Sequence, residues 1–232
     1  MNNLLYILIL ILIIVSCITI LYKPGRNTQE NFKECKYDNL ILNREHFADT
    51  KELLLKFKEL AKELRIDYFA IGGTLIGAVR NGGLLPLDDD IDIGIFKKDY
   101  EKLNNYRNGE YYIKKIGFGF KLKKNDSDMF IDIMVFELSD NKYKIINDSF
   151  PSEYFNKDEI LPLKKMMYSN IQIYVPNKYV EYLNRVFPNW DKTVKVSCGH
   201  HIDDICVYKK HNIPSEFDID YDNSKYSCYS KL

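Results

Sequence analysis

Four aspartates stand within five consecutive positions of the sequence, at Asp88, Asp89, Asp90 and Asp92. Side chains of an extended strand alternate between its two faces, so Asp90 and Asp92 are expected to share one face. The opposite face then carries Ile91, Ile93 and Ile95. Neighbouring carboxylates repel one another unless a cation lies between them. Oxygen ligands at this spacing suit Mg2+ or Mn2+, which bind through a few carboxylates together with substrate phosphates.

A further aspartate, Asp132, lies inside the apolar run 129–136 (MFIDIMVF). A carboxylate in the middle of a buried strand costs free energy unless it is paired or bound to a ligand. Two interpretations stay open. Asp132 is either an exposed residue on a two-sided strand, or a third metal ligand on a strand next to the one that carries Asp90 and Asp92. The second is favoured, because charged residues are seldom placed on such strands without a partner.

A glycine pair, Gly72 and Gly73, precedes Thr74 and follows a short apolar segment. Glycine permits positive φ and the close approach of a ligand to the backbone. A helix expected from Thr74 to Arg80 would direct its first N–H groups at an anion. Arg80 either stabilises the carboxyl end of this helix by its positive charge or binds a phosphate through two parallel hydrogen bonds, and the sequence leaves both roles open.

The surrounding pattern predicts the elements that must position these residues. Apolar residues recur at helical spacing from Leu53 to Leu64, which indicates a helix that begins at Asp49 or Thr50, with Glu52 completing a capping box on Asp49. Strands are expected at 67–71, 111–122 and 129–136, and the strand that carries Asp90 and Asp92 is expected to end at Phe96. A hairpin is expected over 165–175, and further helices at 97–108 and 177–187. The expected fold class is α+β, with a mixed sheet core flanked by helices.

The first part of the chain contains an uncharged apolar stretch of 18 residues, 4–21, which is just long enough to span a bilayer as a helix. Residues 1–22 are therefore expected to form a transmembrane anchor of a single-pass membrane protein. Residues 23–43 would be a linker, 44–195 the catalytic domain and 196–232 a tail of unknown role. A signal peptide, or a lipoprotein signal ending at Cys17, is the alternative. The side of the membrane stays open, because only Lys23 and Arg26 favour a cytosolic domain.

Composition excludes one class of partner. The chain has 33 basic and 33 acidic residues, whereas nucleic-acid binding by bulk charge needs a strong basic excess. The four cysteines outside the apolar stretch fit either two disulfides or free thiols. The Cys and His residues of the tail match no standard zinc spacing, so incidental residues are favoured there.

The longer motif is more specific than its parts. Residues 72–80 (GGTLIGAVR), Gly83, Pro86 and residues 88–93 (DDDIDI) resemble the LicD family. This family has the nucleotidyltransferase fold and includes bacterial phosphocholine transferases and fukutin-related ribitol-phosphate transferases. The segments 161–165 (LPLKK), 175–177 (VPN) and 182–183 before Trp190 are similar to the second half of the family, so the resemblance extends over residues 52–190. Leu87 stands where the family usually has Trp, and Asn81 where it often has His.

The resemblance implies an enzyme that moves a phosphorylated alcohol from a CDP-linked donor to a hydroxyl of a glycan and releases CMP. The alcohol would be choline, ribitol or glycerol. Mg2+ or Mn2+ held by Asp90, Asp92 and Asp132, with Asp88 acting directly or through water, would neutralise charge and activate the incoming hydroxyl. Asp132 would be a candidate to accept the hydroxyl proton. The phosphate contacts implied are Gly72, Gly73 and Thr74 around the pyrophosphate, with Arg80 and, more weakly, Lys164 or Lys165.

Two other functions stay open. The same acids would serve a nucleotidyltransferase that adds a nucleotide to a sugar or small molecule, since both chemistries need the same metal ions. A membrane-tethered module that binds a CDP compound without turnover would also keep the fold.

Overall fold

The computed structural model describes residues 44–85, 88, 90–104, 106–127 and 129–195, together with 201–202, 205–206 and 216–218. The chain divides into the units Met1–Glu34 and Cys35–Leu232, and every described residue belongs to the second unit. The linker expected at 23–43 therefore lies outside the described residues, as do Pro86, Leu87 and Asp89 of the motif.

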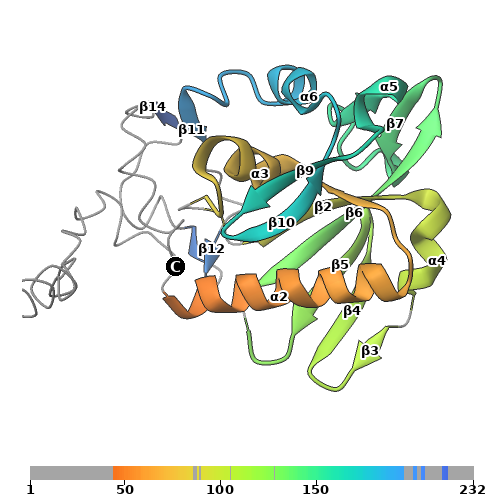
Figure 1. Cartoon of the computed structure of the whole chain (residues 1–232), viewed down its shortest axis with the longest axis vertical. Helices are drawn as coiled ribbons and strands as arrows, with labels where there is room; N and C mark the ends of the chain where they lie inside the picture. Colours follow the sequence, from red (N-terminus) through yellow and green to blue (C-terminus); the bar gives the residue numbers. More distant parts are fainter. Residues whose placement is uncertain are drawn as a thin grey trace, which may run out of the picture. The chain divides into compact units, whose positions relative to one another are not determined.

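A mixed sheet forms the centre of the described residues (Figure 1). Its strands, from one edge to the other, are β1 (Tyr68–Ala70), β2 (Asp90–Phe96), β6 (Phe130–Ser139), β5 (Gly119–Lys124), β4 (Tyr111–Ile116) and β3 (Arg107–Asn108). β2 and β6 run parallel, while every other pair in this order is antiparallel. The carboxyl-terminal part of β6, from Phe136 to Ser139, also pairs with β7 (Lys142–Ile145), and β7 pairs in turn with β8 (Tyr154–Asn156). The expected α+β class with a mixed sheet is confirmed.

Helix α2 (Arg44–Glu63) packs across one face of this sheet, over β2, β6 and β5. Its apolar stripe includes Leu53 and Phe57, both fully buried, and it meets the face of β2 that carries Ile91 and Ile93. Burying an apolar side chain of this size stabilises the fold by about 1.5–3 kcal/mol relative to leaving it in water. The isoleucine alternation of β2 therefore directs its aspartates to the face opposite α2.

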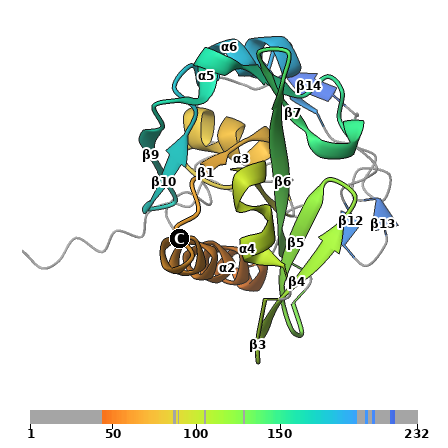
Figure 2. The ribbon, with the colours of Figure 1, turned by 90° about the vertical axis from the view of Figure 1, so that its right-hand side faces the viewer.

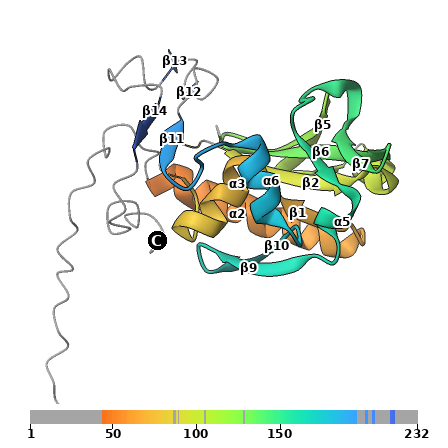
Figure 3. The same ribbon diagram turned by 90° about the horizontal axis from the view of Figure 1, so that it is seen from above.

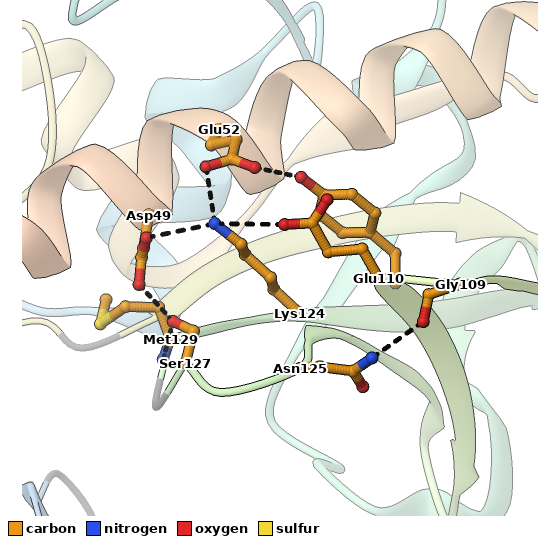
Figure 4. A network of polar contacts seen from close by, with 9 residues as sticks. Asp49, Glu52, Gly109, Glu110, Lys124, Asn125, Ser127 and Met129 are labelled. Carbon is orange, nitrogen blue, oxygen red and sulfur yellow. Dashed lines mark hydrogen bonds and ion pairs between the residues drawn. The ribbon is translucent and has the colours of Figure 1, made fainter.

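A polar network joins α2 to the edge of the sheet (Figure 4). The Lys124 ammonium lies 2.9 Å from Glu52, 3.6 Å from Glu110 and 3.7 Å from Asp49. Ser127 donates a 2.6 Å hydrogen bond to Asp49, and its hydroxyl accepts one from a backbone N–H at the start of β6. The predicted capping box is wrong, because α2 begins at Arg44 and Asp49 lies within the helix, where its carboxylate contacts the sheet instead. The network thereby fixes the loop that leads into β6.

The face of the sheet opposite α2 carries two groups of side chains, one aromatic and one acidic. Near the carboxyl ends of β2 and β6 an aromatic cluster fills it, built from Phe69, Phe136, Phe155 and Tyr182. The rings of Phe155 and Tyr182 stack at 4.1 Å, which fixes α6 (Tyr179–Val186) and β8 over this half. Figure 2 shows β6 as a long strand that leaves the lower part of the sheet and reaches β7 near α5 (Lys157–Ile160). The acidic residues occupy the other half of the same face.

A second, smaller layer covers β1. The predicted hairpin is confirmed as β9 (Lys164–Tyr168) and β10 (Ile171–Val175), with β10 beside β1 and β9 beside the helical turn η2 (Gly77–Asn81) (Figure 3). The helix expected from Thr74 begins earlier, as α3 (Gly72–Ile76), and continues directly into η2. The glycine turn and the hairpin are therefore neighbours in space.

Two expected elements are divided in the structure. The strand predicted at 111–122 is a hairpin of β4 and β5, in which Gly119 has φ +148° and lies so close to β6 that a Cβ would stand 2.2 Å from the Ile133 carbonyl oxygen. The helix predicted at 97–108 is only the single turn η3 (Lys97–Asp99) followed by α4 (Tyr100–Leu103). The chain then extends into β3, because Tyr106 and the following residues join the sheet edge.

The tail contributes short strands. β11 (Thr193–Lys195) pairs with β14 (Glu216–Asp218), and β12 (His201–Ile202) pairs with β13 (Ile205–Cys206). Strand pairing thus links residues on both sides of the domain boundary expected at 195. The disulfide, thiol and zinc alternatives concern side chains outside the described part of the chain.

The expected single-pass membrane localisation is contradicted. Within the described residues, no helix combines the length and the apolar character needed to cross a bilayer. α2 has 20 residues, but one of its faces carries exposed charges at Lys51, Glu59 and Lys62. The stretch 4–21, on which the expectation rested, lies outside the described residues.

Candidate active site

Three carboxylates converge on the face of the sheet opposite α2. Asp92 on β2 stands directly opposite Asp132 on β6, because the two parallel strands pair in this register. Asp90 lies two residues earlier on the same face of β2. One oxygen from each of Asp90, Asp92 and Asp132 lies within 4.8 Å of the others. Such a set of carboxylate oxygens is able to bind a hard divalent cation.

The glycine turn holds the Asp92 carboxylate in place. The Gly73 N–H donates a 2.9 Å hydrogen bond to Asp92 Oδ2, and the Asp92 N–H donates a 2.7 Å bond to the Thr74 hydroxyl. Gly72 has φ +51°, and a Cβ there would stand 2.4 Å from Asp92 Oδ2. Only glycine fits this position without moving the carboxylate. In this structure the Gly73 N–H therefore serves Asp92, while its contact with a pyrophosphate stays a prediction.

Asp88 packs against the same turn. Its residue is 7 % exposed, and a Cβ on Gly73 would stand 2.2 Å from Asp88 Oδ2. Although part of Asp92 reaches solvent, burial of its carboxyl group raises its pKa well above the usual value, and the negative charges of Asp88, Glu153 and Asp132 raise it further. A divalent cation would relieve this repulsion. The donor set and its charge therefore fit Mg2+ or Mn2+.

Lys121 is a cation that the sequence reasoning did not single out. It stands opposite Asp132 in the β5–β6 register, and its ammonium lies 3.2 Å from Asp132 Oδ1. The same ammonium is 3.4 Å from the centre of the Phe130 ring. The available signal was the alternation of β5, in which Phe120 and Leu122 face α2 and Lys121 must therefore face the acids.

Glu153 was also missed. It precedes β8, and burial raises the pKa of its carboxyl group, an effect that the hydrogen bond from Tyr182 partly offsets. The buried Tyr182 hydroxyl donates this bond over 3.0 Å. The negative charge of Glu153 raises the pKa of Asp92. A single Glu in a loop gives no sequence signal, because its contact with Tyr182 joins residues that are distant in the sequence.

The basic residues implied by the motif lie in different places. Arg80 donates hydrogen bonds to Asn81 Oδ1 at 2.9 Å and to the Trp190 carbonyl at 2.5 Å, so it ties η2 to the segment after α6. Lys164 and Lys165 are exposed on β9, with the Lys164 ammonium 5.7 Å from the centre of the Tyr179 ring. The phosphate contacts expected of these residues stay predictions.

Comparison with known proteins identifies relatives of this chain. Residues 65–178 match the family described as LicD/FKTN/FKRP, nucleotidyltransferase domain. An uncharacterised protein of Rickettsia typhi is 32 % identical over 160 residues, which are 64 % of this chain and 48 % of that protein. The lipopolysaccharide cholinephosphotransferase LicD of Haemophilus influenzae is 44 % identical over 46 residues, or 20 % of this chain and 17 % of the relative. The ribitol-5-phosphate transferase FKTN of Mus musculus is 30 % identical over 94 residues, or 34 % and 20 %.

The matches are partial. The chain spans about half the length of the Rickettsia typhi relative. Among solved structures, the antibiotic-resistance factor ANT(2'')-Ia is 18 % identical with a TM-score of 0.40, over 60 % of this chain and 76 % of that one. A likeness of that size supports no inference about fold or function.

Proposed function

The chain belongs to the LicD/FKTN/FKRP nucleotidyltransferase family through residues 65–178, and we propose that it is a metal-dependent transferase of phosphorylated alcohols. In this proposal a phosphocholine, ribitol phosphate or glycerol phosphate group moves from a CDP-linked donor to a hydroxyl of a glycan, and CMP is released. The names of two relatives, a cholinephosphotransferase and a ribitol-5-phosphate transferase, support this reaction class.

The observation that carries the proposal is the convergence of Asp90, Asp92 and Asp132 beside the glycine turn. Phosphoryl transfer requires neutralisation of charge on the transferred group and alignment of the attacking oxygen. Asp90, Asp92 and Asp132 would hold Mg2+ or Mn2+, and Asp88 would help to hold the ion directly or through water. When bound, such an ion would polarise the phosphoryl oxygens and stabilise the leaving CMP.

The residues of the chain supply the remaining requirements. The acceptor oxygen forms a bond to the phosphorus of the phospho-alcohol, while the bond from that phosphorus to the CMP oxygen breaks. The hydroxyl proton passes to a carboxylate of the cluster, for which Asp132 is the candidate. The turn at Gly72 and Gly73 keeps the Asp92 carboxylate in position, which the geometry of transfer requires.

The experiment is a donor screen with CDP-choline, CDP-ribitol and CDP-glycerol, in which CMP release is measured with and without Mn2+. Asp132→Asn is expected to lower the rate about 10²–10³-fold, by analogy with the loss of one charge-stabilising group. Asp140→Asn makes the same change at an exposed turn between β6 and β7 and serves as the control.

The outcomes separate the candidate functions. Release of CMP that depends on the metal and on Asp132 supports the proposal. Release of pyrophosphate from a nucleoside triphosphate, with no CMP from any donor, would replace it with nucleotide addition. Metal-dependent binding of a donor without turnover would indicate a binding module.

A further inference from the structure

Two rows of side chains extend from the acidic cluster across the sheet, on the face opposite α2. The register of β2, β6, β5 and β4 places Asp92, Asp132, Lys121 and Lys114 in one row. The next row, two residues along each strand, contains Asp90, Phe130, Lys123 and Tyr112. Each row begins with an aspartate on β2 and reaches a lysine on β5, so the face changes from negative to positive across adjacent strands.

The two rows meet at Lys121. Its ammonium contacts Asp132 of the first row at 3.2 Å and the Phe130 ring of the second at 3.4 Å from the centre. Lys114 is exposed and Lys123 is partly exposed, and neither has an ion-pair partner among the described residues. On this face of β4 and β5, among the described residues, an ion pair therefore balances the charge of Lys121 but not that of Lys114 or Lys123.

We propose that this face of β4 and β5 is the acceptor subsite, and that it selects a glycan bearing a negative charge such as a phosphate or carboxylate. The inference rests on the proposed transferase function and adds the class of acceptor. Charge complementarity favours an anion over Lys114 and Lys123. The partly exposed ring of Tyr112 offers an apolar face on which the C–H side of a sugar ring can pack.

The spacing suits an acceptor that reaches from the basic strip to the acids. Neighbouring strands lie about 4.8 Å apart, so Lys114 on β4 is about 10 Å from Asp132 on β6 across the row. The rows are about 7 Å apart along the strands. An acceptor held by its charge over β4 and β5 would therefore present a hydroxyl one to two sugar units away at the carboxylates. A neutral glycan would gain no charge–charge attraction to Lys114 and Lys123.

The test compares two probes on the full chain, the methyl glycoside of N-acetylglucosamine 6-phosphate and the same glycoside without phosphate. Affinities are measured by NMR titration in Mg2+ and again in EDTA. The phosphorylated probe is expected to bind about five- to tenfold more tightly, as two partly exposed charge contacts allow. The double variant Lys114→Gln/Lys123→Gln is expected to lose this preference. Lys51→Gln/Lys62→Gln, on the exposed face of α2, removes the same charge elsewhere and should keep it.

Each outcome decides the question. A preference that persists in EDTA and disappears only in the β4–β5 variant supports the subsite. Equal affinity for the two probes, equal loss in both double variants, or a preference that exists only in Mg2+ would overturn it, the last because the ion rather than the lysines would then hold the phosphate. CMP release by the wild-type protein is measured in parallel. If CMP is released but the probes bind equally, the acceptor inference fails while the transferase proposal stands.

Discussion

Replacement of Gly72 by alanine should disable the acidic cluster while leaving the fold intact. The new Cβ would stand 2.4 Å from Asp92 Oδ2, whereas an ordinary contact begins at 3.4 Å. The Asp92 carboxylate must therefore move by about 1 Å, and a misplacement of about 1 Å at a reacting centre costs on the order of 10²-fold in rate. The positive φ adds a backbone strain of about 1–3 kcal/mol for a non-glycine residue.

The control separates strain from displacement. Gly109 has the same φ of +51°, but a Cβ there would meet nothing within 4 Å. Gly109→Ala should therefore lose similar free energy of unfolding, measured by denaturant titration, and keep both Mn2+ affinity and CMP release. Gly72→Ala should lose Mn2+ affinity, measured by the paramagnetic signal of the free ion, together with about two orders of magnitude in CMP release. Wild-type Mn2+ affinity in Gly72→Ala would refute the argument, because the carboxylate would then not depend on the missing Cβ.

Three other changes test the surroundings of the cluster. Tyr182→Phe removes the hydrogen bond to Glu153 and leaves a buried carboxyl group without that donor, so the free energy of unfolding should fall by about 1–3 kcal/mol in urea titration. Lys121→Met removes a cation beside Asp132, and Mn2+ should bind about fivefold more tightly by calorimetry, after discounting for screening. The pKa of Asp92 and of Glu153 is raised in the folded chain, so the folded state holds these protons more tightly than the unfolded state. In EDTA the melting temperature should therefore fall as pH rises from about 4 through the raised pKa values, and the stabilisation by Mg2+ should grow over the same interval. A melting temperature that rises with pH in EDTA over this interval would contradict the sign.

The sequence was sufficient to predict the strand pair that carries the acids. Ile91, Ile93 and Ile95 are fully buried, and Asp90 and Asp92 share the other face, because period-2 alternation follows from strand geometry. The apolar run around Asp132 likewise indicated a strand that needs neighbours on both faces. The position of Asp132 beside Asp90 and Asp92 could be expected, since a carboxylate inside an apolar strand needs a partner or a ligand. The contact of Asp132 with Lys121 was not expected.

Other features depended on contacts that no local pattern contains. The Asp49–Glu52 pair looks like a capping box, yet the helix already begins at Arg44, and Lys124 and Ser127 bind the same carboxylates instead. Glu153 acts on Asp92 and accepts a hydrogen bond from Tyr182, which is distant in the sequence. In both cases a residue distant in sequence determined the outcome, and spacing within one element was no guide.

The hydrogen bonds of the glycine turn also change the meaning of the motif. A strand followed by two glycines and a helix suggests backbone N–H groups that wait for a phosphate. Here the Gly73 N–H and the Thr74 hydroxyl are both engaged with Asp92, and the spaces beside Gly72 and Gly73 are filled by the carboxyl groups of Asp92 and Asp88. The lack of a Cβ at Gly72 and Gly73 therefore leaves room for two acidic side chains of the neighbouring segment. The two glycines and the aspartates that follow about fifteen to twenty positions later therefore pack as one unit. Moving the aspartates would leave the space beside the glycines empty, and a side chain at the glycines would displace the carboxyl groups.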